Sequence, residues 1–225
     1  MNTIHALTIA SLFLFSQVLS VAQNPPHHTQ LSLTRAASVQ DSRFAKLSLP
    51  LGVSVEVPKN WLRLDGDINA TIEATAEAAM NLSGIELPRG KKVNLFRATS
   101  MPRTTYASIA INATDSDMNP NDLKTAPEKE IRELATVMHE GLQRGLAVQN
   151  MQVIEFYGVR REYVGKHPAL VFEYKRSGPQ GPVIVQMTRL FLGAKEISLN
   201  LSYRESEGQV WKPIIQYVRK SLAVK

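Results

Sequence analysis

The sequence contains no cysteine among its 225 residues. Disulfide bonds, thiol catalysis, thiolate metal sites and iron–sulfur clusters are therefore excluded, and the folded state has to be stabilised by its buried core. A bacterial lipoprotein signal also requires a cysteine, so we expect no lipid tether. Hydrophobic residues make up 44% of the chain and charged residues 20%, the composition of a protein that folds around such a core.

Lys, Arg, Asp and Glu are absent from the first 22 positions. The apolar stretch Ala6–Phe15 is followed by the small residues Ser20 and Ala22, which is typical of a cleaved signal peptide over residues 1–22. The missing positive charge ahead of that stretch leaves an uncleaved N-terminal anchor as the alternative. Residues 23–41 are rich in Pro, His, Thr and Ser and are predicted to form a flexible linker. We therefore expect a periplasmic or secreted protein with a single domain over residues 42–225.

Positive charge is unevenly distributed along the chain. Residues 1–150 carry 14 Lys and Arg against 14 Asp and Glu, whereas residues 151–225 carry 12 against 6. The whole net charge of +6 thus belongs to the last third, where a basic surface would attract an anionic ligand or an envelope partner. A solvated basic face without a dedicated partner is the alternative. Nucleic acid is not an expected partner, because no motif for binding it is present.

Alternation of apolar and polar residues predicts β-strands throughout the folded part. The pattern occupies residues 47–49, 53–57, 93–98, 106–112, 151–163, 170–175, 183–192 and 197–204. Gly158 interrupts one stretch and predicts a bulge. The last stretch is the clearest half-buried strand, with apolar residues alternating with Ser198, Asn200 and Ser202. Short turns between several stretches indicate antiparallel pairing.

Three segments change to the period of an amphipathic helix. Residues 67–83 have one apolar face, and Thr125–Glu128 forms a capping box ahead of a helix expected to end near Gly145. A closing helix is expected to start near Trp211, because an earlier start would place Pro213 inside it. These elements predict an α+β protein, an antiparallel sheet covered by helices on its faces.

Three stretches carry a resemblance to a known fold. Val55–Trp61 looks like a strand followed by Pro-x-x-Trp, Gly165–Ala169 leads into a strand, and the closing helix ends in Ser221–Leu222. These features resemble the PsbP-like fold, an α/β/α sandwich shared by the photosystem subunit PsbP, a Ran-binding nuclear import factor and exported bacterial proteins. The resemblance covers about Ala45 to Leu222. It implies a protein that acts by binding, and it carries no catalytic residues over to this chain.

Two stretches begin like catalytic motifs but lack a required residue. His139–Gln143 starts like a zinc-protease helix, yet Gln143 stands where the second His is needed. Gly52–Glu56 starts like a nucleophile elbow, yet Glu56 replaces the second glycine. We therefore interpret His139 as a residue flanking a buried helix face and Ser54 as a solvent-side residue of a strand.

Metal-binding patterns are also incomplete. Asp115–Asp122 matches the first half of a calcium loop, but Pro120 occupies the position of the required Gly and Ala126 that of the bidentate Glu. We interpret it as a polar loop between a strand and a helix, with a calcium site of another type as the alternative. His27 and His28 in the linker are too few to hold a metal. No metal site, cofactor or catalytic residue is predicted.

Arg189 is the candidate residue for binding a ligand or partner. It shares one face of its predicted strand with apolar side chains, namely Val183, Val185, Met187 and Phe191. A charge on such a face has to be paired or has to line a cavity. Arg189 therefore either reaches an anionic ligand between sheet and helix or forms a salt bridge, with Glu173 or Glu196 as the partner.

These patterns favour a non-enzymatic binding or accessory protein of the cell envelope, engaging an anionic partner through a basic C-terminal face. The first alternative is a small hydrolase or transferase whose site residues meet only in space. The second is a carrier of a small apolar ligand held between helices and sheet.

Overall fold

The structure is a computed structural model that describes residues 43–64 and 93–225. The signal peptide predicted over residues 1–22, the linker predicted over residues 23–41 and the helix predicted over residues 67–83 lie outside the described residues.

A seven-stranded antiparallel sheet forms the centre of the described fold. Its strand order is β3-β4-β5-β9-β8-β7-β6, and each strand pairs antiparallel with its neighbours. The strands are β3 Leu62–Arg63, β4 Val93–Thr99, β5 Ala107–Asp115, β6 Val153–Val164, β7 His167–Arg176, β8 Val183–Leu192 and β9 Lys195–Arg204. The antiparallel pairing predicted from the short turns is confirmed.

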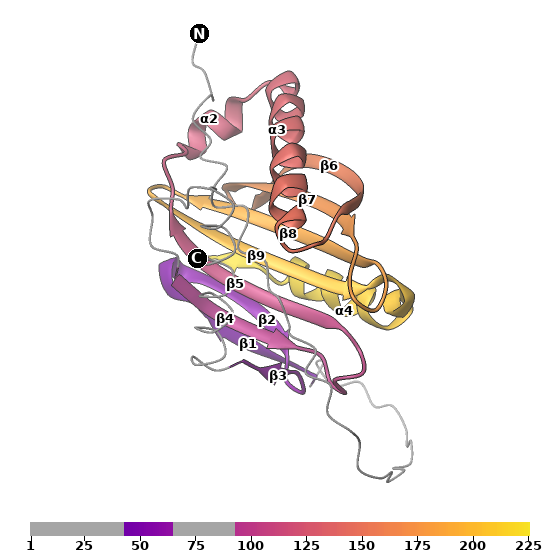
Figure 1. Ribbon diagram of the computed structural model, residues 1–225. Helices are drawn as coiled ribbons and strands as arrows, with labels where there is room; N and C mark the ends of the chain where they lie inside the picture. Colours follow the sequence, from indigo (N-terminus) through magenta and orange to yellow (C-terminus); the bar gives the residue numbers. More distant parts are fainter. Residues whose placement is uncertain (1–42, 65–92) are drawn as a thin grey trace, which may run out of the picture.

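A three-stranded antiparallel sheet and one helix cover one face of the large sheet. The small sheet has the order β1-β2-β10, with β1 Phe44–Ser48, β2 Val53–Pro58 and β10 Ala223–Val224. The helix α4, Gly208–Lys220, contacts both β9 and β2. The other face carries α3, Glu128–Ala147, which lies over β6, β7 and β8 (Figure 1). The predicted α+β arrangement, with helices on both faces of an antiparallel sheet, is confirmed.

Each face of the large sheet has its own hydrophobic core. Trp61, Phe96, Leu199, Trp211 and Ile215 belong to the core on the α4 side. The core on the α3 side combines α3 residues with β7 and β8 residues: Leu134, Met138, Leu142, Leu170, Phe172 and Met187. The division follows from strand alternation, because successive side chains of a strand point to opposite faces.

The start of α3 differs from the predicted capping box. Pro127 occupies the N-cap position and no side chain caps the helix. Thr125 instead ends a short helix, α2 Pro120–Thr125, and its hydroxyl donates to the carbonyl oxygen of Asn121 at 3.1 Å. The polar loop predicted over residues 115–122 is thus helical from Pro120 onward, and α3 extends to Ala147 rather than ending near Gly145.

The start of α4 was also placed wrongly by the sequence. The helix begins at Gly208, after a 3-10 turn at Glu205–Glu207, and contains Pro213. Because Pro213 is only the sixth residue of the helix, its missing N–H costs a single backbone hydrogen bond near the helix start. Trp211 offsets that loss, since its indole Nε1 donates to the Glu207 carboxylate at 2.7 Å.

Two further expectations concern single residues. The bulge at Gly158 is confirmed, because the β6–β7 register shifts between Phe156 and Gly158, and Gly158 has a positive φ of 100° that favours glycine. Ser54, expected on the solvent side of its strand, is buried in β2, where it pairs with Ser48 of β1 and Ala223 of β10. No helix in residues 43–64 or 93–225 is long and apolar enough to span a membrane.

Candidate ligand-binding site

Polar side chains occupy half of the sheet face that carries α3. Where α3 covers β7 and β8 the face is apolar, but over β4, β5 and β9 it is polar. We call this region the polar band and define it by Asn94, Arg97, Thr99, Ser108, Asn112, Glu196, Ser198, Asn200, Ser202 and, from β8, Arg189. Arg97, Thr99, Ser108, Asn112, Arg189, Glu196 and Ser202 are buried.

The strand register brings these residues together from distant parts of the sequence. One row across the sheet pairs Asn94 with Asn112, Asn112 with Ser198, and Ser198 with Arg189. Opposite residues of antiparallel strands lie about 5 Å apart, so the members of a row are direct neighbours. A second row pairs Thr99 with Ser108 and Ser108 with Ser202.

The β9 residues of the polar band correct an expectation from the sequence. A half-buried strand implies that Ser198, Asn200 and Ser202 face solvent. Ser202 is instead buried, and Ser198 and Asn200 are half-buried. Ser202 is packed against Ser108 and Tyr106, and its hydroxyl shares hydrogen bonds with both of theirs.

Arg189, the candidate from the sequence, lies in a buried ion pair with Glu196. Its Nε donates to Glu196 Oε1 at 2.6 Å and its Nη2 donates to Oε2 at 2.5 Å, and the two residues are 5% and 3% exposed. Glu173, the other partner considered, accepts a hydrogen bond from Gln186 instead. The pair is neutral as a whole, so it satisfies the buried charge within the chain. A role of Arg189 in ligand binding stays a prediction.

The side-chain amide of Asn112 is buried without hydrogen bonds. The residue is 1% exposed, and neither its Oδ1 nor its Nδ2 has a hydrogen-bond partner within the described residues. Within the described residues, both side-chain amide atoms of Asn94, its neighbour in the row, are also buried and unbonded. The same is true of the Oδ1 atom of Asn200. A buried polar group without a partner costs about 1–3 kcal/mol, so these amides weaken the fold unless something else bonds to them.

A chain of hydroxyl groups forms one end of the polar band. Ser108 Oγ and Ser202 Oγ share a hydrogen bond of 2.7 Å, and Tyr106 Oη and Ser202 Oγ share one of 3.2 Å. Arg176, at the end of β7, donates from Nη2 to Tyr106 Oη at 3.5 Å. The polar band thus continues from the amides through three hydroxyls to a guanidinium.

Arg176 is the residue that the sequence reasoning missed. It is 7% exposed, and its Nη1 donates to the Ser177 carbonyl oxygen at 2.9 Å and to Met151 Sδ at 3.0 Å. In the part of the chain that the structure describes, none of its partners is a carboxylate, and its Nε has no partner. The alternation that singled out Arg189 would also have found it, since Arg176 continues the buried face of Phe172 and Tyr174.

The surroundings of Arg176 are strongly desolvated. Burial raises the pKa of the neighbouring Tyr174 well above its ordinary value, because an apolar environment disfavours the phenolate. The positive charge of Arg176 acts in the opposite direction on that pKa but is the smaller effect. The phenol of Tyr174 is therefore neutral at physiological pH.

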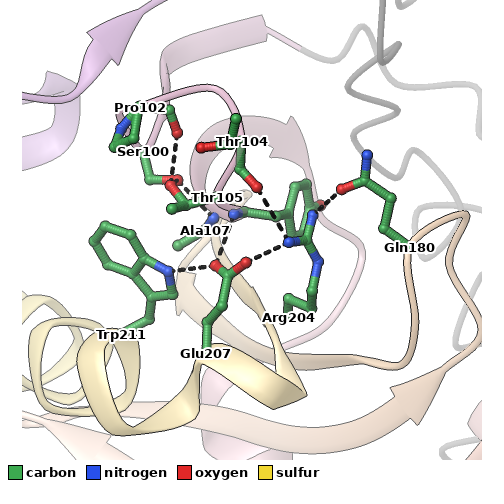
Figure 2. A network of polar contacts seen from close by, with 10 residues as sticks. Ser100, Pro102, Thr104, Thr105, Ala107, Gln180, Arg204, Glu207 and Trp211 are labelled. Atoms are coloured by element: carbon green, nitrogen blue, oxygen red, sulfur yellow. Dashed lines mark hydrogen bonds and ion pairs between the residues drawn. The ribbon is translucent and has the colours of Figure 1, made fainter. Parts of the chain in front are cut away.

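A second polar network ties the neighbouring loops to the start of α4. Figure 2 shows the Glu207 carboxylate between Trp211 and Arg204, with both side chains directed at it. Glu207 also accepts from the backbone N–H of Tyr106 at 2.9 Å, and Arg204 binds Gln180 of the β7–β8 loop. Every carboxylate oxygen of Glu207 is thus engaged within the chain, so this network fixes the loops rather than offering a free reactive group.

Most of the excess positive charge in residues 151–225 is internally satisfied. Six of the twelve cations form salt bridges: Arg160, Lys175, Arg189, Lys195, Arg204 and Arg219. Arg161 donates to three carbonyl oxygens around the end of α2. Lys166, Lys212, Lys220 and Lys225 remain as exposed cations, and they are scattered over a turn, α4 and the C-terminus.

The incomplete motifs have structural roles in the fold. His139 stacks on Phe156 with ring centroids 4.8 Å apart. Asp115 forms a salt bridge with Lys195, and Asn119 caps α2 by accepting from the N–H of Asn121 at 3.0 Å. Within residues 43–64 and 93–225, no group of three or more His, Cys, Asp or Glu is placed to hold a metal ion.

A scan against protein-family models gives no match, and a search of the curated proteins gives none either. Among solved structures, cyanobacterial PsbP (CyanoP) from Synechocystis sp. PCC 6803 covers 86% of this chain and 99% of its own length, with 16% identity and a TM-score of 0.49. LpqN, involved in cell envelope biogenesis of Mycobacterium tuberculosis, covers 83% of this chain and 94% of its own length, with 10% identity and a TM-score of 0.43. A cyanobacterial PsbP is thus among the solved structures to which this chain is similar. At these identities the likeness concerns the fold alone.

Proposed function

We propose that the protein is a non-enzymatic binding protein of the cell envelope that holds a small polar ligand on the polar band. The observation that carries the proposal is Asn112, whose buried side-chain amide has no hydrogen-bond partner among residues 43–64 and 93–225. An unsatisfied buried amide lowers stability, and it offers both a donor and an acceptor to a bound molecule. The nearby side chains of Asn94 and Asn200 also have buried amide atoms that could hydrogen-bond to such a molecule.

The absence of a preassembled reactive group supports binding rather than catalysis. Of the histidines in the described residues, His139 stacks on Phe156 and His167 begins β7. Neither imidazole is hydrogen-bonded to a hydroxyl or a carboxylate in that part of the chain. The hydroxyls of Ser108 and Ser202 bond to one another, with no general base beside them.

The proposal is tested with the substitution Asn112→Leu. Leucine has the same branching as asparagine and carries no polar atoms, so the variant should be more stable than wild type without ligand, by about 1–3 kcal/mol. The same variant should lose ligand binding. Stability is measured by urea denaturation, and binding by thermal shift against a panel of sugars, amino acids, organic acids and phosphate esters, with hits confirmed by calorimetry.

Thr188→Val is the matched control. Thr188 lies in β8, is buried, and has an unbonded hydroxyl, but its side chain points to the opposite face of the sheet. This variant should gain stability in the same way and keep binding. The proposal fails if no compound stabilises the wild type, or if the compounds shift the melting temperatures of Asn112→Leu and Thr188→Val by the same amount.

Export to the envelope is tested separately. When the full chain is expressed with its leader in a bacterial host, cleavage after Ala22 leaves Gln23 as the first residue. Intact-mass measurement of the protein from the periplasmic fraction should give that mature mass. Recovery of the uncleaved chain from the membrane fraction would support the N-terminal anchor instead.

A further inference from the structure

We infer that the ligand of the polar band carries an oxyanion, a carboxylate or phosphate, and that Arg176 binds it. The inference rests on the proposed binding function and names the class of ligand. It starts from charge: Arg176 is a buried guanidinium whose partners are a carbonyl oxygen, a thioether and a phenol. A buried cation without a counter-ion is costly, and a bound anion would supply the counter-charge.

The two edges of the Arg176 guanidinium are used differently. Nη1 is held by Ser177 O and Met151 Sδ, and these contacts fix the plane of the group. Among the residues that the structure describes, Nε has no partner, and Nη2 has only the hydroxyl of Tyr106 at 3.5 Å, the outer limit of a hydrogen bond. The edge formed by Nε and Nη2 is the one with which arginine grips carboxylate and phosphate through two parallel hydrogen bonds. Arg176 therefore has one anchored edge and one edge suited to an oxyanion.

The groups beside that edge suit the rest of such a ligand. Tyr106 Oη and Ser202 Oγ lie next along the polar band and can donate to a further anion oxygen or to the body of the ligand. Ser108 follows, and Asn112 lies four residues further along β5, about 13 Å away at the rise of a strand. The arrangement fits an elongated molecule with an oxyanion at one end and hydrogen-bonding groups along its length.

Arg176 differs from the other cations of the C-terminal third. Arg189 and Arg204 already hold carboxylates, and Lys212 and Lys220 are exposed on α4. Exposed lysines attract anions weakly and lose the attraction as salt is raised, whereas a buried bidentate site is screened much less. Salt dependence therefore separates the two kinds of site.

The test measures the thermal stability and the calorimetric affinity of the full chain with two probes, sodium phosphate and sodium succinate, at constant ionic strength against sodium chloride. The wild type should be stabilised by at least one probe in a concentration-dependent way. Arg176→Met keeps the packing and removes the charge, and should weaken binding by about tenfold or more. Arg176→Lys keeps the charge but loses the bidentate edge, and should also weaken binding. The probe that binds more tightly tells whether the oxyanion is a phosphate or a carboxylate.

Lys212→Met is the control, because it removes one positive charge from an exposed position. It should leave the response to the probes unchanged. If Arg176→Met does not fold, Tyr106→Phe, which removes only the hydroxyl beside the guanidinium, should still weaken probe binding. The inference is overturned if neither probe stabilises the wild type, or if Lys212→Met loses the response as strongly as Arg176→Met.

The outcome for Arg176 is separable from that for Asn112. Phosphate and succinate are too short to reach from Arg176 to Asn112, so Asn112→Leu should leave their binding intact. A neutral compound could bind the wild type but not Asn112→Leu, while neither anion stabilises the wild type. This result would support the proposed function and contradict the inference that the ligand carries an oxyanion. The opposite result is that the anions bind in a way that depends on Arg176, while no compound of the panel binds in a way that depends on Asn112. It would support the oxyanion site and contradict the proposal that the ligand extends along the polar band.

Discussion

The Arg189–Glu196 pair shows how a buried charge is held inside this fold. Both side chains are inaccessible to water and are joined by two hydrogen bonds. Removing one partner leaves the other charge buried without compensation, which costs about 3–5 kcal/mol. We therefore expect Glu196→Gln to lower the free energy of unfolding by roughly that amount in urea denaturation.

Two controls test this explanation. Asp115→Asn breaks an exposed pair with Lys195 and should cost no more than about 1 kcal/mol. Replacing both residues of the buried pair, as Arg189→Leu with Glu196→Leu, should restore most of the stability lost in the single variant. A double variant that is as unstable as Glu196→Gln would mean that the pair is needed for more than charge balance.

Tyr174 should make the protein sensitive to alkaline pH. Burial raises the pKa of its phenol well above the ordinary value. Above about pH 10 the tyrosine of the unfolded chain ionises while Tyr174 in the folded chain does not, so the unfolded state is favoured. The contribution of Tyr174 is fully present below that pH and is lost as the pH rises towards its folded pKa.

The measurement is the free energy of unfolding at neutral and alkaline pH for wild type and Tyr174→Phe. Phenylalanine cannot ionise, so the variant should lose less stability between the two conditions. Phenolate absorbance should also show one tyrosine fewer among those that ionise only on unfolding. An identical alkaline loss in both proteins would contradict the assignment.

At the scale of elements, Glu207 joins β9, α4 and the residue that precedes β5. It accepts from the backbone N–H of that residue, Tyr106. It also accepts from the Trp211 indole and pairs with Arg204 (Figure 2). Glu207→Ala leaves two donors without partners, and we expect a loss of about 2 kcal/mol or more in urea denaturation. Faster hydrogen exchange at the Tyr106 amide should accompany it. Glu205→Ala removes a pair between the exposed Glu205 and the half-buried Lys175, which keeps Glu155 as a partner, and should cost about 1 kcal/mol at most.

Local pattern was sufficient to predict most strands but not every helix boundary. Strand alternation in residues 183–192 and 197–204 placed β8 and β9 nearly to the residue. Helix starts depend on single contacts between neighbouring elements. The Glu207–Trp211 hydrogen bond starts α4 ahead of Pro213, and Thr125 bonds back into α2 instead of capping α3.

The candidate site could be predicted only in part, because it is made by pairing across the sheet. Asn112 and Ser198 are 86 positions apart in the sequence (198 − 112 = 86), and only the β5–β9 register makes them neighbours. Alternation gives the face on which a polar residue lies but not whether that face is covered. Arg176 is the exception, since its place after Phe172 and Tyr174 on one strand face is visible in the sequence.

At the scale of the whole molecule, one sheet separates two hydrophobic cores. β8 contributes Leu190 to the core on the α4 side and Met187 to the core on the α3 side. The two cores are therefore the two faces of one element rather than two independent halves. Damage to either core should weaken the strands that the other core depends on.

This coupling predicts a single unfolding transition for core variants on either side. Leu142→Ala on α3 and Ile215→Ala on α4 should each cost about 2–5 kcal/mol. Trp61 and Trp211 both lie in the α4-side core, with ring centroids 5.7 Å apart, so tryptophan fluorescence reports on that side only. In Leu142→Ala, the midpoint seen by fluorescence should shift as far as the midpoint seen by far-ultraviolet circular dichroism. A fluorescence midpoint that stays at the wild-type value while circular dichroism moves would show that the two faces unfold separately.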